Sequence, residues 1–264
     1  MALTRYEEVA AHLRERIEAG EYPAGQKMPS VRTLTAVYDV SDGTIRQALR
    51  ILEATGLVRT ALKSGIIVRN RANRRRLTRA SQISHDGAIY RFPAAAPEGE
   101  PWDAHGDPVA SVEPVPADVA AALDLEPGTP TVRRRRVMSP RGEEPWDVID
   151  TWIPPRVIDQ APAAGAPNPN EGGLRGGALA RIEEAGHGPL SWEETARAST
   201  PTKEEADLLG ISPHMPVMRI LRVGYSAADG SPVECTAYVI PADRVEIHTS
   251  LTRGPSARWP VTYR

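Results

Sequence analysis

Several residue types are scarce in this chain of 264 residues, and each shortage excludes a class of protein. A single cysteine, Cys235, rules out a disulfide framework and a zinc site built from several thiolates. One phenylalanine stands against 25 prolines, which predicts many short elements rather than a helical bundle. No run of about 18 apolar residues occurs, so we expect no membrane span. Residues 1–11 lack the apolar core of a signal peptide, so we expect a cytoplasmic protein.

The charges are unevenly distributed although the net charge is only −2. Residues 1–79 hold 15 Lys and Arg against 8 Asp and Glu, a balance of +7. Residues 80–264 hold 17 against 26, a balance of −9. A basic first segment joined to an acidic remainder indicates a nucleic-acid-binding module attached to a second domain. The alternative is chance clustering of surface charge.

Periodicity divides the first 70 residues into three helices and a hairpin. Apolar residues recur at helical spacing from Tyr6 to Ile17, and two further short stripes follow Ser30 and Ser41, which are plausible N-caps. Residues 57–60 and 66–68 alternate like strands around a tip at 63–65. The order of helix, helix, tight turn, helix and hairpin predicts a winged helix-turn-helix domain.

In such a domain the third helix enters the major groove of DNA, and its early exposed residues reach the base edges. Arginine reads guanine and glutamine reads adenine through paired hydrogen bonds. Residues near helix starts and at the hairpin tip are placed for phosphates. The alternative for each is a solvated polar residue. The candidate DNA-binding residues are Ser30, Arg32, Ser41, Thr44, Arg46, Gln47, Arg50, Lys63, Ser64 and Gly65.

The segment from Tyr6 to Val68 resembles the DNA-binding domain of the GntR family of bacterial transcription regulators. The resemblance lies in the order and spacing of residues that include Gly20, Tyr22, Gly25, Met28-Pro29-Ser30, Arg32, Val40-Ser41, Thr44, Arg46, Ala48-Leu49 and Gly56-Leu57-Val58. The family often has a basic residue where this chain has Asp42. An acidic side chain there predicts altered docking on the operator.

The stretch that follows the hairpin is rich in arginine. Six arginines lie between residues 69 and 79. They predict either a solvated tether or additional phosphate contacts, which would steepen the salt dependence of DNA binding. Residues 93–108 are rich in Pro, Gly, Ala and acidic residues and are expected to form a loose connection. We therefore divide the chain into residues 1–72, a linker 73–108, a second domain 109–248 and a tail 249–264.

The second domain contains an internal repeat. Four pairs of residues are separated by 86 positions, namely Leu123 and Leu209, Pro130 and Pro216, Arg133 and Arg219, and Arg136 and Arg222. Each copy reads as a short helix, a proline turn, a strand, a hairpin and a strand that ends at a proline. Two copies predict a pseudo-two-fold pair of helix-hairpin units rather than a solenoid. Residues 179–185 between the copies are expected to be helical, and residues 190–198 to form a strand.

The strand expected at residues 131–138 carries four consecutive arginines. Alternation sends Arg134 and Arg136 to one face of the sheet and Arg133 and Arg135 to the other. Two guanidinium groups on one face form a clamp for phosphate or carboxylate. The alternative is a charged face exposed to solvent. Trp152 and Trp192 are equally compatible with the core and with stacking on a ligand.

This repeat resembles the effector domain of the HutC branch of the GntR family, the UTRA domain, over most of residues 109–248. The resembling segments include 119–130, 204–216 and 225–244 with Pro232-Val233-Glu234. The resemblance implies an α+β fold shared with chorismate lyase, with an antiparallel sheet and a small acidic or phosphorylated ligand bound between the halves. It further implies that Arg134 and Arg136 hold the anion and that Glu234 accepts a hydrogen bond from the ligand. No Ser/Thr-Phe-Ser/Thr run stands near Ser111, so a sugar phosphate is not specifically expected.

The sequence thus predicts a DNA-binding transcription regulator, a repressor, that acts as a homodimer on a palindromic operator in double-stranded DNA. A small anionic effector would change its affinity for DNA. Two alternatives remain, an effector-independent DNA-binding dimer and an enzyme fused to a DNA-binding domain. No phosphate loop, nucleophile elbow or metal-spaced histidine pair is found. We therefore expect no catalytic residues, cofactor or metal, and no association with a membrane.

Overall fold

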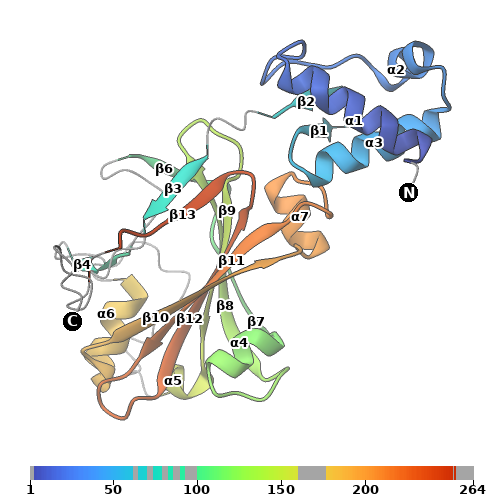
Figure 1. Cartoon of the computed structure of the whole chain (residues 1–264). Helices are drawn as coiled ribbons and strands as arrows, with labels where there is room; N and C mark the ends of the chain where they lie inside the picture. Colours follow the sequence, from blue (N-terminus) through green and yellow to red (C-terminus); the bar gives the residue numbers. More distant parts are fainter. Residues whose placement is uncertain are drawn as a thin grey trace, which may run out of the picture.

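The computed structural model describes residues 3–61, 65–69, 74–78, 83–85, 90–92, 100–159, 177–251 and 253. The first domain consists of three helices and a two-stranded hairpin, and it stands apart at one end of the molecule (Figure 1). Its elements are α1 (Arg5–Glu18), α2 (Val31–Tyr38), α3 (Asp42–Ala54), β1 (Val58–Ala61) and β2 (Gly65–Val68). This is the order that periodicity predicted for a winged helix-turn-helix.

Local hydrogen bonds explain where the second and third helices begin. The hydroxyl of Ser30 accepts the backbone N–H of Thr33 at 3.2 Å, and that of Ser41 accepts the N–H of Thr44 at 3.2 Å. Each bond satisfies a backbone donor that the first turn of a helix leaves free. The apolar stripes then meet in one core, which includes Val9, Leu13, Leu34, Ile45, Leu49, Leu52, Leu57 and Ile66.

The second domain is built on a seven-stranded antiparallel sheet with helices beside it (Figure 1). Its strands are β3 (Arg75–Thr78), β4 (Ser84–His85), β5 (Tyr90–Arg91), β6 (Trp102–Ala104), β7 (Val109–Pro114), β8 (Pro130–Pro140), β9 (Asp147–Ile153), β10 (Ser191–Ser199), β11 (Val217–Tyr225), β12 (Pro232–Pro241) and β13 (Val245–His248). Its helices are α4 (Ala117–Ala122), α5 (Pro155–Asp159), α6 (Gly177–Ile182) and α7 (Lys203–Leu209).

The order of strands in the sheet displays the internal repeat. The sheet runs β10-β11-β12-β9-β8-β6, and β7 also pairs with β8. Strands β9 and β12, which end the two repeated units, are neighbours at the centre. Asp150 of β9 lies directly across from Ala237 of β12. These two positions are 87 residues apart, as are Pro154 and Pro241, the prolines at which the two repeated units end. The pseudo-two-fold axis therefore passes through this pair.

The two faces of the sheet have different coverings. Helices α4 and α7, one from each repeat, both pack on the same face over apolar residues such as Leu221, Val239 and Cys235. The opposite face is covered at one end by β3 and β13, which pair in parallel and bury Leu77 and Val245. Its remaining part carries the polar side chains described below.

Two segments differ from the sequence expectations. Residues 73–108 were expected to be a linker that ends in a loose connection, but β3 and β6 within this range pair with β13 and β8. Strand pairing across a long sequence separation leaves no local signal, so composition alone misjudged them. The helix expected at 179–185 ends at Ile182 and continues as a π-helical turn, Glu183–His187, in which Gly186 takes a φ of 104°. Of the tail expected at 249–264, residues 252 and 254–264 lie outside the described residues.

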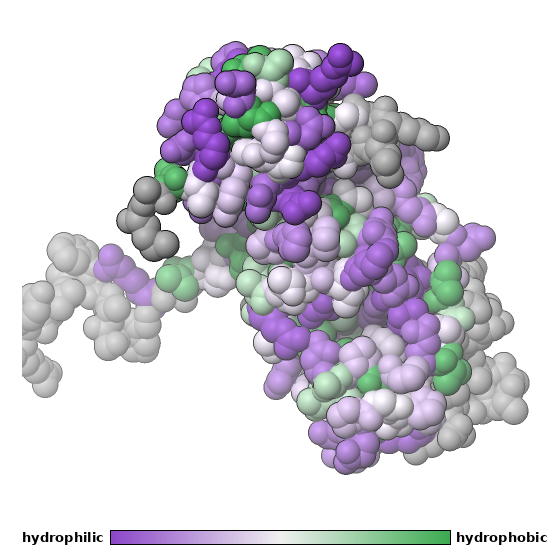
Figure 2. Space-filling model, turned by 90° about the vertical axis from the view of Figure 1, so that its right-hand side faces the viewer, coloured by the Kyte–Doolittle hydropathy of each residue, from purple (hydrophilic) through white to green (hydrophobic). Residues whose placement is uncertain are grey.

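The surface of the molecule is mostly polar on the side displayed in Figure 2, where hydrophobic residues form only small, scattered spots. Within the described residues, no helix has the length and apolar character needed to cross a membrane.

Candidate DNA-binding face and ligand-binding face

The outer face of α3 carries the side chains that were predicted to read DNA. Arg46, Gln47 and Arg50 are exposed, whereas Ile45, Ala48 and Leu49 on the inner face are buried. A helix with one apolar face in the core presents its opposite face to solvent. Thr44 is partly buried, and its hydroxyl lies 2.9 Å from that of Ser41 at the start of the helix. The structure therefore brings three long polar side chains to one exposed helical surface.

The remaining predicted contacts surround this surface. Arg32 is exposed in the first turn of α2, next to its N-cap Ser30. Gly65 begins β2 with a φ of 78°, a left-handed conformation that glycine adopts without strain. Lys63 and Ser64 lie outside the described residues. The hydroxyls of Ser30 and Ser41 already accept hydrogen bonds from their own helices, which leaves them less able to contact DNA.

Asp42 has a structural role that the sequence did not indicate. Its carboxylate accepts a hydrogen bond from the hydroxyl of Thr35 at 2.9 Å, which ties the start of α3 to α2. A carboxylate in the first turn also interacts favourably with the helix dipole. Asp42, which stands where the family often has a basic residue, therefore connects the two helices of the helix-turn-helix through a hydrogen bond.

On the face of the sheet opposite α4 and α7, three arginines form a cluster. A row of residues crosses four strands, from Arg134 on β8 through Thr151 and Thr236 to Arg222 on β11. Arg136 lies two residues along β8 on the same face. The Nε atoms of all three arginines are buried and have no hydrogen-bond partner within the described residues. Burial, together with the neighbouring Arg136, lowers the pKa of Arg134.

Glu234 lies against this cluster and is almost completely buried. One of its oxygens accepts the hydroxyl of Thr236 and lies 3.7 Å from Arg222, while the other oxygen has no partner within the described residues. Burial raises the pKa of Glu234, and the nearby Arg222 opposes that shift. The unpartnered oxygen points toward Gly224, where the indole N–H of Trp192 also lies without a partner. A buried carboxylate oxygen of Glu234 and the buried indole N–H of Trp192 thus lie beside Gly224, each without a hydrogen-bond partner within the described residues.

Three residues of this face were not among the predicted site residues. Arg222 is the repeat counterpart of Arg136, so the spacing of 86 residues was a signal for it. Its guanidinium donates to the hydroxyl of Tyr238 at 2.7 Å and lies 3.4 Å from the centre of the Phe92 ring. Asp147 at the start of β9 is buried, and its desolvation raises the pKa to about 7 against the opposing charge of Arg136. Nothing in the sequence singled out Phe92 or Asp147.

The other two arginines of β8 have partners on the helical face. Arg133 contacts Glu113 at 2.7 Å, and Arg135 binds both oxygens of Asp150 at 2.6 and 2.7 Å. Trp152 packs in the core beneath α4. The alternation of four arginines therefore places two ion-paired side chains, Arg133 and Arg135, on the helical face and Arg134 and Arg136 on the opposite face.

The two domains meet through a buried ion pair. Arg69, which follows the wing, lies 3.1 Å from Asp243 in the turn between β12 and β13, and both side chains are about nine-tenths buried. Arg59 on β1 lies 2.7 Å from Glu144 in the hairpin between β8 and β9. Gly56 packs so closely on Asp243 that an added Cβ would lie 2.8 Å from the Cβ of that residue. The turn before β13 is therefore the docking point of the first domain.

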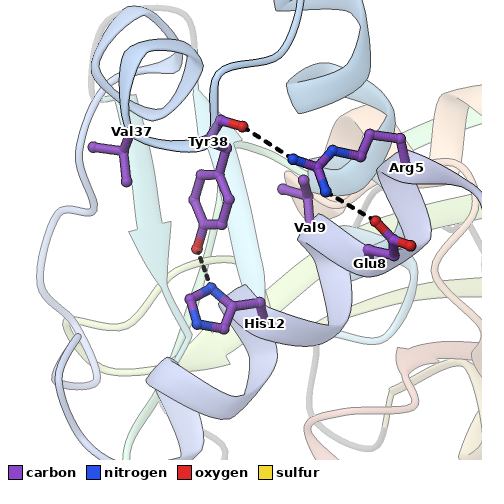
Figure 3. Close-up of a pocket in the computed structure, with 6 residues that line it drawn as sticks. All are labelled: Arg5, Glu8, Val9, His12, Val37 and Tyr38. Atoms are coloured by element: carbon purple, nitrogen blue, oxygen red, sulfur yellow. Dashed lines mark hydrogen bonds and ion pairs between the residues drawn. The ribbon is translucent and has the colours of Figure 1, made fainter.

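A separate cleft of about 390 Å³ lies between α1 and the end of α2 (Figure 3). His12 bonds to the hydroxyl of Tyr38 at 2.8 Å, and Arg5 reaches the backbone oxygen of Tyr38 at 3.4 Å. The cleft is lined by none of the residues predicted to contact DNA or effector.

The fold and the two faces define a regulator with a winged helix-turn-helix domain and a ligand-binding domain. Comparison with protein families agrees, since residues 5–68 match the gntR family of bacterial regulatory proteins and residues 109–246 match the UTRA domain. The chain belongs to the GntR family of transcription regulators that carry a UTRA domain.

Several known proteins align with nearly the whole length of this chain. An uncharacterized HTH-type transcriptional regulator of Streptomyces coelicolor is 28% identical over 87% of this chain and 86% of its own length. Another from Rhizobium meliloti is 27% identical over 94% and 95%. A crystal structure assigned to the GntR family aligns with a TM-score of 0.55 and 27% identity, over 95% of this chain and 98% of that one.

Proposed function

We propose that this chain is a HutC-type repressor in the cytoplasm that binds a palindromic operator as a homodimer and releases it when a small anionic effector binds. The outer face of α3 supports the DNA-binding part most directly. Arg46 and Gln47 can each form paired hydrogen bonds with one base, and Arg50 extends the same surface by one turn. One recognition helix covers only a few base pairs, so two copies on a palindrome double the number of bases read.

The operator can be found by selecting bound sequences from a random DNA library. Replacing Arg46 by Ala should then weaken binding to the selected operator by about 1–3 kcal/mol and relax the preference at one base position. Arg141→Ala is the matched control, because Arg141 is an exposed arginine in a hairpin of the second domain. Equal affinity of Arg46→Ala and the control would contradict the assignment of α3.

The arginine face supports an anionic effector. Arg134 and Arg136 present buried N–H groups without partners, and Arg222 adds a third guanidinium that Glu234 and Tyr238 hold in place. Burying such donors without a partner costs free energy, which a bound carboxylate or phosphate would recover. The free oxygen of Glu234 fits a hydrogen-bond donor at the other end of the ligand. We propose no catalytic role, and the full-length relatives are described as regulators.

The domain junction offers a route from this face to DNA. Strand β9 begins at Asp147, three residues after Glu144, which pairs with Arg59 of the first domain. Strand β12 ends two residues before Asp243, which pairs with Arg69. An effector that moves β9 or β12 relative to the helices would displace the docking point. It regulates DNA binding only if it binds the two arrangements unequally.

A thermal-shift screen of small carboxylic and phosphorylated acids would identify the effector. The double variant Arg134→Ala and Arg136→Ala should keep its affinity for the operator and lose both the thermal shift and the release of DNA. Arg141→Ala is again the control. An unchanged effector response in the double variant would refute the arginine clamp.

A further inference from the structure

A short segment from between the two domains lies on the arginine face of the sheet. Its strands β4 and β5 pair only with each other among the described residues, through Ser84 with Arg91 and His85 with Tyr90. They therefore share no backbone hydrogen-bond ladder with the seven-stranded sheet. We call residues 90–92, which leave this small pair, the strap. An element with so few backbone bonds to the core opens at a low cost in free energy.

The side chain of Tyr90 holds one end of the strap. Its hydroxyl donates to a carboxylate oxygen of Glu183 at 2.5 Å, in the turn that follows α6. The other oxygen of Glu183 accepts the backbone N–H of Leu190 at 2.8 Å, just before β10. The ring of Tyr90 also lies 5.1 Å from the ring of Trp192, measured between ring centres. The strap is thus fixed to the end of the sheet where β10 begins.

The side chain of Phe92 reaches the arginine cluster itself. The centre of its ring lies 3.4 Å from the guanidinium carbon of Arg222 and 5.2 Å from the ring centre of Trp192, which meets it edge-on. An aromatic face attracts a cation, and more strongly when both groups are withdrawn from water. The side chain of Arg222 is only 7% exposed. Phe92 therefore fills the space directly over this guanidinium.

The ring of Phe92 covers polar atoms whose hydrogen bonds it cannot supply. The Nε of Arg222 and the indole N–H of Trp192 lack an acceptor within the described residues, and one oxygen of Glu234 beside them lacks a donor. Buried polar groups without partners cost free energy, which a ligand with matching polar groups would recover. The place of Phe92 is therefore one that a suitable ligand can take over.

We propose that Phe92 is an internal occupant of the effector site, and that the effector is an acid with a flat ring that takes the place of the Phe92 side chain when it binds. The inference rests on the anionic effector of the proposed function and adds the chemistry of the rest of that molecule. The acid would bind Arg134 and Arg136, and the ring would stack on Arg222 beside Trp192.

The arginine row is short enough for one small molecule to reach both of its ends. Arg134 and Arg222 stand three strands apart in the sheet, which separates their backbones by about 14 Å, and their long side chains shorten that span. The charge of Arg136 also opposes the burial that raises the pKa of Glu234, so Arg136 acts near the centre of the row. A ring that carries one acidic group fits this spacing.

Phenyl phosphate is a probe that joins a ring to an anion, and inorganic phosphate is the same anion without the ring. Isothermal titration calorimetry on the full-length protein measures the affinity for each. Phe92→Ala should bind phenyl phosphate about tenfold more tightly than the wild type, because the ligand no longer displaces a stacked side chain. Inorganic phosphate should gain much less. Phe92→Tyr keeps the ring and should bind both probes like the wild type.

A second variant changes the hold on the strap and leaves Phe92 in place. Tyr90→Phe removes the hydroxyl that binds Glu183. It should bind phenyl phosphate more tightly than the wild type but less tightly than Phe92→Ala, because the strap opens more readily. Val109→Ala is the matched control, since it shortens an exposed apolar side chain on β7 and should leave both affinities unchanged.

The outcomes separate this inference from the proposed function. If Phe92→Ala binds phenyl phosphate no more tightly than the wild type, or if neither protein binds it, the internal occupant is overturned. Equal gains for phenyl phosphate and inorganic phosphate overturn the ring. The double variant Arg134→Ala and Arg136→Ala tests the clamp alone. Unchanged binding of phenyl phosphate to that variant refutes the arginine clamp of the proposed function, and with it the placement of the acid.

Discussion

Asp147 is expected to make the stability of the second domain depend on pH. Its side chain is buried at the start of β9, one carboxylate oxygen has no hydrogen-bond partner within the described residues, and desolvation raises its pKa from 3.8 to about 7. In the unfolded chain the same carboxyl ionises near its ordinary value. As pH rises from 4 to 7, the unfolded state therefore loses the proton first, and the folded state becomes less stable relative to it.

The pKa values set the size of this effect. A shift of one pKa unit corresponds to 1.36 kcal/mol, so a rise from 3.8 to about 7 amounts to about 4 kcal/mol lost between pH 4 and pH 8. Asn has a similar shape and cannot ionise. The Asp147→Asn variant should match the wild type near pH 4 and exceed its stability by up to about 4 kcal/mol at pH 8.

Urea unfolding at pH 4, 6 and 8 measures the difference. All five tryptophans lie beyond residue 100, so tryptophan fluorescence reports on the second domain and the segment that leads into it. Asp107→Asn, at an exposed position, is the control and should show no trend with pH. A stability difference between Asp147→Asn and the wild type that stays constant from pH 4 to pH 8 would refute the raised pKa.

Three further predictions concern the first domain and its junction. Ser41→Ala should lower the stability of the first domain by about 1 kcal/mol in thermal unfolding, because the start of α3 loses its cap; no loss would contradict the capping role. Gly56→Ala should be destabilising and should expose the junction to protease, since its φ is 70° and its Cβ would collide with Asp243; wild-type protease resistance would show that the junction is looser than described. Arg69→Ala and Asp243→Ala should each cost about 3–5 kcal/mol, as removal of one partner leaves a buried charge. The double variant should cost less than the sum of the two, and strict additivity in a double-mutant cycle would argue against direct pairing.

The sequence was most informative where structure depends on near neighbours. Helical periodicity located α1, α2 and α3, and a hydroxyl before each of the last two stripes marked the N-caps that the structure contains at Ser30 and Ser41. The exposed face of α3 followed from the same periodicity. Alternation along β8 correctly assigned Arg134 and Arg136 to one face of the sheet and Arg133 and Arg135 to the other. The repeat indicated paired helix-hairpin units, and the sheet places their end strands side by side.

Only the tertiary structure decided which residues from distant parts of the sequence lie next to each other. Strand register brings Arg222 and Arg134 into one row, and a distant segment places Phe92 over Arg222; neither is encoded in local spacing. The pKa of Asp147 depends on burial by residues from other strands. The parallel pairing of β3 with β13 joins positions about 170 residues apart, which composition assigned to a linker and an acidic domain.

Local preferences act over one turn or one hairpin, so the sequence by itself determined the elements, their caps and the faces on which their side chains lie. Desolvation and long-range pairing depend on the whole packed chain. The fold therefore decided which charges of β8 have an acidic partner, as in Arg133 and Arg135, and which stand on the opposite face with buried Nε atoms that lack a partner within the described residues, as in Arg134 and Arg136.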